Sequence, residues 1–552
     1  MGNKSHTGAQ LFAQCLVNQG VERIFGVPGA KIDALFDALI DTPIEVIVCR
    51  HEQNAAFMAA SFGRLTGKPG VVLVTSGPGV SNLTTGLLTA TTEGDPIVAI
   101  GGNVPRAMKY KASHQQADNV GLLREATKSA VEVPVVEAIP ELVANAFRDA
   151  VAPRSGACSI SVPQDILVET TKTPACEQPP IPQKGAASAE SITKLSLAIT
   201  QAERPVLLLG EESSAPQAAE AVRRLLQHHP IPVVSTYQAA GVVPRELVDC
   251  FVGRVGLFRN QPGDRLLAKS DCIVAVGFNP VEYDPEIWHV DNTVCLCDVN
   301  SRSCSVRSAY QPTLECVGDI AASLDAVKTT LPSSDGVKHK DIIASLRQGI
   351  LSQYEEGKHY DGTPVHPLRF IYELRTALDD QALVISDVGS HYMWLARYFW
   401  SYEPRHLLFS NGQQTLGVAL PWAMGAHFAY PDKRIVSVSG DGGFLFSAME
   451  LETAVRIQAN FIHFVWCDGS YDMVKEQQHM KYDRDTAVQL GHVDIVRYAE
   501  SFGATGLRLR DPSEIPALLE EYQGSGPVLV EVPIDYSDNP NLFKAMHEHL
   551  GN

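Results

Sequence analysis

The sequence predicts an α/β protein built from three doubly wound parallel-sheet domains. Short apolar stretches of strand length alternate with amphipathic stretches of helical length along the whole chain. This alternation starts again after each of two polar segments, 171–190 and 332–361, which we expect to be linkers. The chain has 552 residues, which suits about three domains. We therefore expect domains at residues 1–170, 191–331 and 362–540.

Composition and charge exclude several classes of protein. The 45 Lys and Arg residues are outnumbered by 63 Asp and Glu residues, so no basic excess is available for nonspecific nucleic-acid binding. The N-terminal MGNKSHTG lacks an apolar signal region, and no apolar stretch is long enough to span a membrane. We expect a cytoplasmic protein without nucleic-acid or membrane partners.

The cysteines predict a reducing compartment. There are eleven, an odd number, and no CxxC pair occurs among them. Cys295, Cys297 and Cys304 form the closest group along the chain. This spacing does not favour a zinc site, and we expect reduced thiols in the protein core.

The first domain places candidate ligands after its strands. We expect helices at 7–19, 54–66 and 81–93 and strands at 21–25, 44–49, 71–75 and 97–101. Glu52 follows the strand 44–49, at the sheet edge where open α/β folds bind ligands. Alternatively, Glu52 is simply an acid at a helix start, which the helix dipole favours. Lys31 is the best local cation for a substrate carboxylate, although a lone lysine is usually solvated. The SGPG loop at 76–79 opens a helix and could bind phosphate.

The middle domain predicts a small doubly wound sheet. We expect strands at 205–209, 231–235, 272–276 and 293–298. Such a sheet could hold a nucleotide, but no GxGxxG fingerprint follows any of these strands.

The third domain contains the stretch with the strongest chemical signal, residues 434–474. A strand at 435–439 leads into Gly440-Asp441-Gly442-Gly443, a helix at about 447–458, and a strand at 461–467 that ends on Asp468. Glycine backbone N–H groups followed by a helix start bind phosphate. Asp441 would repel that phosphate unless a divalent cation lay between them, and Asp468 could supply a second oxygen ligand. The alternative is a plain turn between a strand and a helix.

Two further loops in this domain could contact a ligand that contains a diphosphate. A helix at 367–378 and a strand at 382–386 lead to Gly389, Ser390 and His391. The polar loop NGQQTLG at 411–417 precedes a helix rich in Ala and Gly. That loop could otherwise be plain surface structure.

The 434–474 stretch resembles the thiamine-diphosphate motif of the pyruvate decarboxylase, pyruvate oxidase and acetohydroxyacid synthase superfamily, which opens with GDG and closes on Asn or Asp. The resemblance implies that Asp441 and Asp468 bind Mg²⁺ through their side chains and Ser470 through its backbone carbonyl. The family motif usually closes with an Asn pair or with Asp-Asn. This chain has Asp468-Gly469 instead, so the second amide is missing.

The resemblance covers about residues 7–540 and implies roles for individual residues. Glu52, in RHEQNAAFMA, corresponds to the acid that hydrogen-bonds N1′ of the cofactor's aminopyrimidine. Gln115 corresponds to a glutamine facing the reacting carbon, and Gln477 takes the place of a tryptophan that favours 2-ketobutyrate in anabolic enzymes. The candidate catalytic residues are thus Glu52, Gln115 and Gln477 from the resemblance, together with Lys31 as the local cation. The implied cofactor-binding residues are Glu52, Gly389, Ser390, His391, Gln413, Gln414, Leu416, Gly440, Asp441, Gly442, Gly443, Met473 and Val474.

Three stretches, STYQAAGVV, RVGLFRNQPGDRLL and NPVEYDPEIW, look most like catabolic acetolactate synthases, which carry no FAD. This resemblance implies decarboxylation of pyruvate on thiamine diphosphate and ligation of the two-carbon unit to a second pyruvate, giving 2-acetolactate and CO₂. It implies thiamine diphosphate and Mg²⁺ as cofactors, with FAD unlikely. It also implies a homodimeric catalytic unit, commonly doubled to a tetramer, because Glu52 and Asp441 lie in different domains and meet in the family across a subunit interface.

Other functions stay open from the sequence. An anabolic acetohydroxyacid synthase catalytic subunit would need FAD and a regulatory partner. Another 2-keto acid decarboxylase or oxidase of the family would give different products. A nonenzymatic homologue would only bind a nucleotide in its middle domain, and the presence of Glu52, Asp441 and Asp468 together speaks against it.

Overall fold

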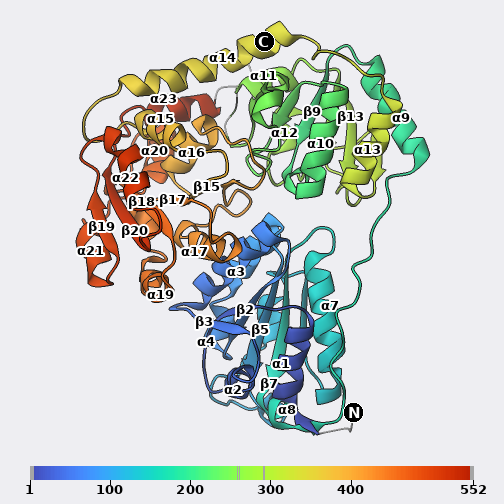
Figure 1. The fold of residues 1–552 in the computed structure, drawn as a ribbon, viewed down its shortest axis with the longest axis vertical. Coiled ribbons are helices and arrows are strands. Elements are labelled where there is room, and N and C mark those ends of the chain that lie inside the picture. The colour runs from blue at the N-terminus through green and yellow to red at the C-terminus, as the bar shows by residue number, and fades with distance from the viewer. Residues whose placement is uncertain (1–4, 258, 260, 290–292, 548–552) are drawn as a thin grey trace. The chain divides into compact units, whose positions relative to one another are not determined.

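The computed structural model describes residues 5–257, 259, 261–289 and 293–547 (Figure 1). The start of the N-terminal MGNKSHTG segment and two positions of the RVGLFRNQPGDRLL stretch, 258 and 260, lie outside the described residues. The chain forms two compact units. The first contains residues up to 182 together with 417–432 and 447–460, and the second contains 183–416, 433–446 and the chain from 461 onward. None of the described helices is both long and apolar enough to span a membrane.

The first unit is built on one parallel six-stranded sheet. Its strand order is β3-β2-β4-β5-β7-β6. The central strands consist of buried apolar runs, as expected where helices cover both faces of a sheet. The strands are β2 (Arg23–Val27), β3 (Glu45–Val48), β4 (Gly70–Val74), β5 (Ile97–Asn103), β6 (Ser129–Glu132) and β7 (Ala157–Pro163), and β1 (His6–Thr7) pairs separately with β8 (Thr170–Thr171). The helices before residue 182 are α1 (Gly8–Asn18), α2 (Asp33–Leu39), α3 (Glu52–Thr66), α4 (Pro78–Ser81), α5 (Thr84–Glu93), α6 (Asn119–Leu123), α7 (Ile139–Val151) and α8 (Gln164–Val168).

Two late segments of the chain also belong to this first unit. The helix α17 (Ala419–Ala429) packs along α3, which is rich in alanine. A Cβ added at Gly425 would lie 2.3 Å from the carbonyl oxygen of Met58, so the two helix backbones approach closely because Gly425 has no side chain. The second segment contains η6 (Ala448–Glu450) and α19 (Leu451–Arg456).

The second unit holds two more parallel sheets of six strands each. The middle sheet has the order β11-β10-β9-β12-β13-β14, which is the strand order of dinucleotide-binding folds. Its strands are β9 (Pro205–Leu209), β10 (Val233–Ser235), β11 (Phe251–Arg254), β12 (Cys272–Val276), β13 (Cys295–Asn300) and β14 (Leu314–Val317). The accompanying helices are α9 (Ala189–Gln201), α10 (Pro216–His228), α11 (Pro262–Leu267), α12 (Pro285–Trp288), α13 (Ile320–Thr330) and α14 (Lys340–Glu356).

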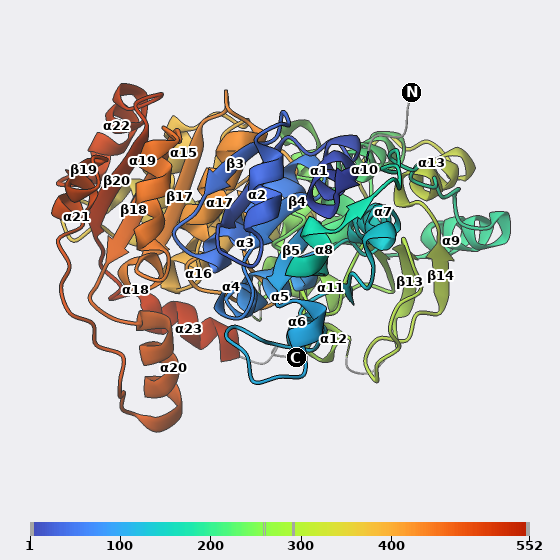
Figure 2. The ribbon, with the colours of Figure 1, turned by 90° about the horizontal axis from the view of Figure 1, so that it is seen from below.

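The C-terminal sheet repeats the topology of the first unit's sheet. Its order is β16-β15-β17-β18-β20-β19. Its strands are β15 (Leu383–Ser386), β16 (Leu407–Leu408), β17 (Ile435–Gly440), β18 (Phe461–Cys467), β19 (Thr505–Arg508) and β20 (Pro527–Pro533). The helices are α15 (Pro367–Ala377), α16 (Ser390–Tyr398), α18 (Asp441–Phe444), α20 (Asp472–Tyr482), α21 (Ile495–Ser501), α22 (Ile515–Glu521) and α23 (Asn539–His547), and α20 packs against α23 (Figure 2).

Three parallel sheets with flanking helices confirm the predicted fold class. One local prediction was wrong. The segment 332–361 is not a plain linker, because it contains the 17-residue helix α14, which buries Ile343 and Ile350. The helix expected at about 447–458 is present as η6 followed directly by α19, and the short helix α18 precedes it.

Candidate active site

The strand order of the C-terminal sheet reverses between β15 and β17. In open α/β folds, ligands bind in the crevice beyond the carboxyl ends of the strands at such a point. The predicted segments Gly389–His391 and Gly440–Gly443 follow directly on these two strands. The topology therefore brings together two glycine-containing turns that lie far apart in the sequence.

A cavity of about 240 Å³ lies at this crevice. The predicted site residues that line it are Gly389, Ser390, His391, Gln414, Leu416, Gly440, Gly442, Gly443, Asp468, Ser470, Met473, Val474 and Gln477. Val388, Tyr471, Asp472 and Tyr536 line it as well, and the sequence analysis assigned them no role. Gln413 is exposed and does not line the cavity. Asp441 lines a neighbouring cavity, to which Asp468 also contributes.

The last two glycines of the GDGG segment leave little room for side chains. A Cβ at Gly442 would lie 2.6 Å from the ring of Tyr471, and a Cβ at Gly443 would lie 3.3 Å from the carboxyl carbon of Asp387. The backbone of this segment is therefore bare where it borders the cavity, as a close approach to an anion requires.

Asp441 and Asp468 place two half-buried carboxylates beside one another. Asp441 accepts hydrogen bonds from the backbone N–H groups of Gly442, at 2.9 Å, and Gly469, at 2.8 Å. Asp468 accepts a hydrogen bond from the hydroxyl of Ser470. Burial raises the pKa of Asp441, and burial together with the charges of Asp441 and Asp472 raises the pKa of Asp468 to about 7. A divalent cation would relieve this repulsion, and carboxylate oxygens are the ligands that Mg²⁺ prefers.

Gly469 has the left-handed backbone angle φ = +73° and open space around its Cα. Its N–H group donates to Asp441, so the glycine that replaces the family's usual asparagine still supports one of the two carboxylates.

Asp472 ties the elements around the cavity together. One of its oxygens accepts hydrogen bonds from the hydroxyl of Ser390, at 2.6 Å, and from the side-chain amide of Asn539. These bonds connect the starts of α16, α20 and α23. This role could not be predicted from the sequence, because the three residues are separated by 67 positions or more.

His391 presents an unpaired buried nitrogen at the cavity. Its side chain is only 1% exposed, and among the described residues its Nε2 has no hydrogen-bond partner. Burial lowers the pKa of His391 to about 3, so the ring is neutral at physiological pH. An unpaired buried nitrogen, two half-buried carboxylates and bare glycine backbone together fit a diphosphate held through a divalent cation.

Glu52 lies in the first unit, as the first residue of α3. Its side chain is 9% exposed, and its Oε2 accepts a hydrogen bond of 2.9 Å from the side-chain amide of Asn82. Its Oε1 lies beside Gly79 of the SGPG loop, 3.5 Å from where a Cβ would stand. Asn82 therefore orients Glu52, and the sequence analysis did not identify it.

Glu450 supports the chain just before Glu52. This carboxylate is fully buried and accepts hydrogen bonds from the backbone N–H of Arg50, at 2.9 Å, and the hydroxyl of Thr453, at 2.6 Å. Its other oxygen accepts a bond of 2.9 Å from the amide of Asn54. Glu450 thus binds the β3–α3 connection at Arg50, before Glu52, and at Asn54, after it.

Gln115 and Lys31 lie in loops of the same unit. Gln115 has φ = +59°, and its backbone lies against Gly77 of the SGPG loop, 3.4 Å from where a Cβ would stand. Gln115 and Glu52 therefore flank the same loop. Lys31 is half-buried in the turn between β2 and α2.

Models of three domains of the thiamine pyrophosphate enzymes match this chain. The N-terminal cofactor-binding domain matches residues 6–122, the central domain 192–327 and the C-terminal cofactor-binding domain 387–532. The chain therefore belongs to the thiamine pyrophosphate enzyme family, thiamine pyrophosphate being a second name for thiamine diphosphate.

Within that family the chain is similar to acetolactate synthases. It is 51% identical to the acetolactate synthase of Bacillus subtilis, over 97% of this chain and 94% of the relative. It is 42% identical to a catabolic acetolactate synthase of Raoultella terrigena, over 98% and 97%. The large subunit of acetolactate synthase isozyme 2 of Escherichia coli is 29% identical, over 96% of both chains.

Proposed function

We propose that this protein is a thiamine-diphosphate-dependent acetolactate synthase that converts two molecules of pyruvate into 2-acetolactate and CO₂. The observation that carries this proposal is the cavity at the β15–β17 crevice, lined by glycine backbone and by Asp468 with Asp441 in the adjoining cavity, in a chain that is 51% identical to an acetolactate synthase. When bound, the cofactor supplies an electron sink for the carbanion that decarboxylation of a 2-keto acid leaves behind.

The residues of the second unit hold the cofactor's charged end in this proposal. Asp441 and Asp468, with the backbone carbonyl of Ser470, bind Mg²⁺, and the metal ion neutralises the diphosphate. The diphosphate contacts are the backbone groups of Gly440–Gly443 and Gly389–His391. The backbone groups of Gln414 and Leu416, which line the cavity, would contact the pyrimidine, and Met473 and Val474 would pack against the thiazolium.

Glu52 is the acid–base residue for the aminopyrimidine end of the cofactor. Its carboxyl group would hold a proton at N1′ of the bound aminopyrimidine, which is the role of a positioned general acid and base. The hydrogen bond from Asn82 and the burial of Glu52 support this role, because they fix one carboxylate oxygen and leave the other beside the SGPG loop. The chemistry needs Glu52 and Asp441 at one cofactor, and we propose that a homodimer, doubled to a tetramer, brings them together.

The second pyruvate binds beside Gln477, with Gln115 and Lys31 as further contacts for its carboxylate and carbonyl. Gln477 lines the cavity, which supports this assignment. A polar glutamine there suits pyruvate as both donor and acceptor.

We further propose that the protein works without FAD, and Glu282 supports this proposal. In the middle sheet the strand order reverses between β9 and β12, where a dinucleotide's pyrophosphate would bind. The buried carboxylate of Glu282 accepts hydrogen bonds there from the backbone N–H groups of Glu211, at 3.0 Å, and Asn279, at 2.9 Å. It also accepts one of 2.5 Å from the hydroxyl of Thr236. A pyrophosphate would meet a fixed negative charge and N–H groups that are already paired.

We place the protein in the cytoplasm. All eleven cysteines are free, which supports a reducing compartment.

The test is to incubate the pure protein with pyruvate, thiamine diphosphate and Mg²⁺ and to identify the products before and after acid treatment. We expect acetolactate, which acid converts to acetoin, from a colourless protein. Acetaldehyde or acetate as the main product would contradict the proposal, and bound flavin would contradict its FAD-independence. Glu52→Gln should abolish turnover and keep cofactor affinity.

A further inference from the structure

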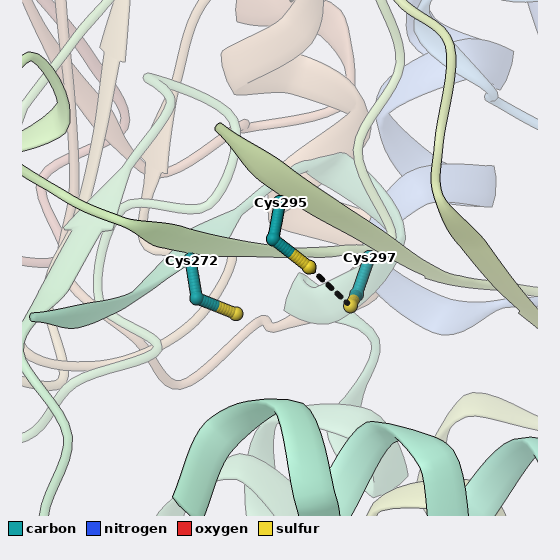
Figure 3. A group of neighbouring side chains, drawn as sticks. All are labelled: Cys272, Cys295 and Cys297. Carbon is teal, nitrogen blue, oxygen red and sulfur yellow. Dashed lines mark hydrogen bonds between the residues drawn. The ribbon is translucent and has the colours of Figure 1, made fainter. Parts of the chain in front are cut away.

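Three cysteines of the middle sheet point their sulfur atoms at one another (Figure 3). Cys272 is the first residue of β12, and Cys295 is the first residue of β13. The two strands are parallel, with Cys272 directly opposite Cys295. Side chains alternate along a strand, so Cys295 and Cys297 share one face. The sheet thereby collects three thiols on one face.

This cluster differs from the group expected from the sequence. Cys304, which is close to Cys295 and Cys297 along the chain, lies instead with Asp298 and Glu315. Cys272 takes its place because β12 and β13 are hydrogen-bonded neighbours, although 23 positions of sequence separate Cys272 from Cys295.

The geometry matches a three-coordinate sulfur site. The three Sγ atoms lie within 4.8 Å of one another, and the Sγ atoms of Cys295 and Cys297 are 4.0 Å apart. Three sulfurs that each lie about 2.3 Å from one zinc ion are separated by roughly 3.8 to 4.0 Å. The observed cluster needs only small side-chain movements to reach that arrangement.

Within the described part of the chain, which omits 290–292 just before β13, no fourth His, Cys, Asp or Glu joins this group of three sulfur atoms. The neighbouring Asp271 uses its two carboxylate oxygens to accept hydrogen bonds from the backbone N–H groups of Glu203, at 2.8 Å, and Arg204, at 2.9 Å. Cys272 and Cys297 are buried, whereas Cys295 is half-buried and offers a path from solvent. A bound ion would thus have three thiolates and one side open to water.

We propose that Cys272, Cys295 and Cys297 form a binding site for one thiophilic d¹⁰ metal ion, the class that includes Zn²⁺, Cd²⁺ and Cu⁺. Thiolate is the ligand that such soft ions select over the hard cations preferred by carboxylates. Binding displaces the thiol protons into solvent and changes no oxidation state. The site lies at the amino-terminal ends of β12 and β13, the edge opposite the crevice where such sheets bind nucleotides. Its ion therefore clamps the two strands and takes no part in the reaction.

The test uses the full-length reduced protein, stripped with EDTA and titrated with Cd²⁺ in excess Mg²⁺, while the ultraviolet sulfur-to-cadmium charge-transfer absorption is recorded. Carboxylate sites give no such band. We expect one equivalent to saturate the band, a melting temperature that rises on loading, and at least tenfold weaker binding in Cys297→Ser. The matched control is Cys316→Ser, a buried cysteine on the next strand outside the cluster, which should bind like the wild type.

A second measurement needs no variant. Iodoacetamide labelling of the wild type, mapped by mass spectrometry, should show Cys295 protected at least tenfold by Cd²⁺, whereas the half-buried Cys176 reacts at an unchanged rate. Absence of the band, wild-type binding by Cys297→Ser, or an unprotected Cys295 would overturn the proposal.

Discussion

Glu450→Gln tests whether a distant buried carboxylate positions Glu52. The wild-type side chain accepts bonds from Arg50, Thr453 and Asn54, and it is fully buried. Glutamine keeps the shape, removes the charge, and turns one of the two accepting oxygens into a donor. One of the three donors must then face another donor.

The magnitude follows from the lost bond. A hydrogen bond to a charged group contributes about 1.5 to 3 kcal/mol, and a buried donor without a partner costs a similar amount. If the lost hydrogen bond displaces Glu52 in the folded protein, the turnover number should fall by about ten- to a hundredfold, since each 1.4 kcal/mol is roughly a factor of ten. If the lost hydrogen bond weakens folding, the melting temperature should drop instead.

The assay measures acetolactate formation and thermal unfolding side by side. Glu452→Gln is the matched control, because Glu452 lies in the same segment and pairs with Arg456 in a half-exposed ion pair, which contributes little. We expect kcat to fall in Glu450→Gln, with KM for pyruvate nearly unchanged. A Glu450→Gln variant whose kcat equals that of Glu452→Gln would refute the positioning role, whether or not its melting temperature drops.

Two glycines and one buried acid give further predictions. Gly469→Asn should leave the free energy of unfolding within about 0.5 kcal/mol of wild type and keep the affinity for Mg²⁺. Asparagine tolerates φ = +73°, there is open space where its Cβ would stand, and the N–H donor to Asp441 remains. A large loss of Mg²⁺ affinity would show that this reasoning is wrong. Gly442→Ala should weaken cofactor binding more than tenfold, because its Cβ would stand 2.6 Å from the ring of Tyr471; binding equal to wild type would count against it. Burial raises the pKa of Asp264 from 3.8 to about 6, so the folded protein binds the carboxyl proton more tightly than the unfolded chain does. The stabilisation from this proton is fully present below pH 3.8 and is lost as the pH rises through 6. Between pH 4 and pH 8, the free energy of unfolding of Asp264→Asn should therefore rise relative to that of wild type by up to about 3 kcal/mol. A difference in thermal unfolding that does not change with pH would contradict this.

The sequence predicts four of the six strands in each large sheet, because parallel strands buried on both faces read as continuous apolar runs, and it did not predict β6, β7, β11, β14, β16 and β19. The strands β9 and β12, for example, begin and end where their apolar runs do. The helix α14 escaped prediction because its two fully buried positions, Ile343 and Ile350, are spaced too widely to give a strong helical pattern.

The site residues at strand ends were predictable, because parallel strands place their ligand-binding ends at one edge of the sheet. The distant residues that hold them in position were not predictable. Glycines and acids after a strand indicate the ligand edge of a parallel sheet, which identified Asp441 and Glu52. Glu450 reaches a loop 400 positions away, and Asp472 reaches Asn539 across 67 positions. No local periodicity encodes such bonds, because they depend on how distant segments pack.

The most direct test of the metal-held cofactor is the binding of thiamine diphosphate, measured by calorimetry with Mg²⁺ and after its removal by EDTA, in wild type and in Asp468→Asn. Asp483→Asn is the matched control, an exposed aspartate whose φ of +55° asparagine tolerates. The account predicts Mg²⁺-dependent binding in wild type and in the control, and binding at least tenfold weaker in Asp468→Asn. Equal binding by Asp468→Asn, or binding by wild type that does not depend on a divalent cation, would contradict it.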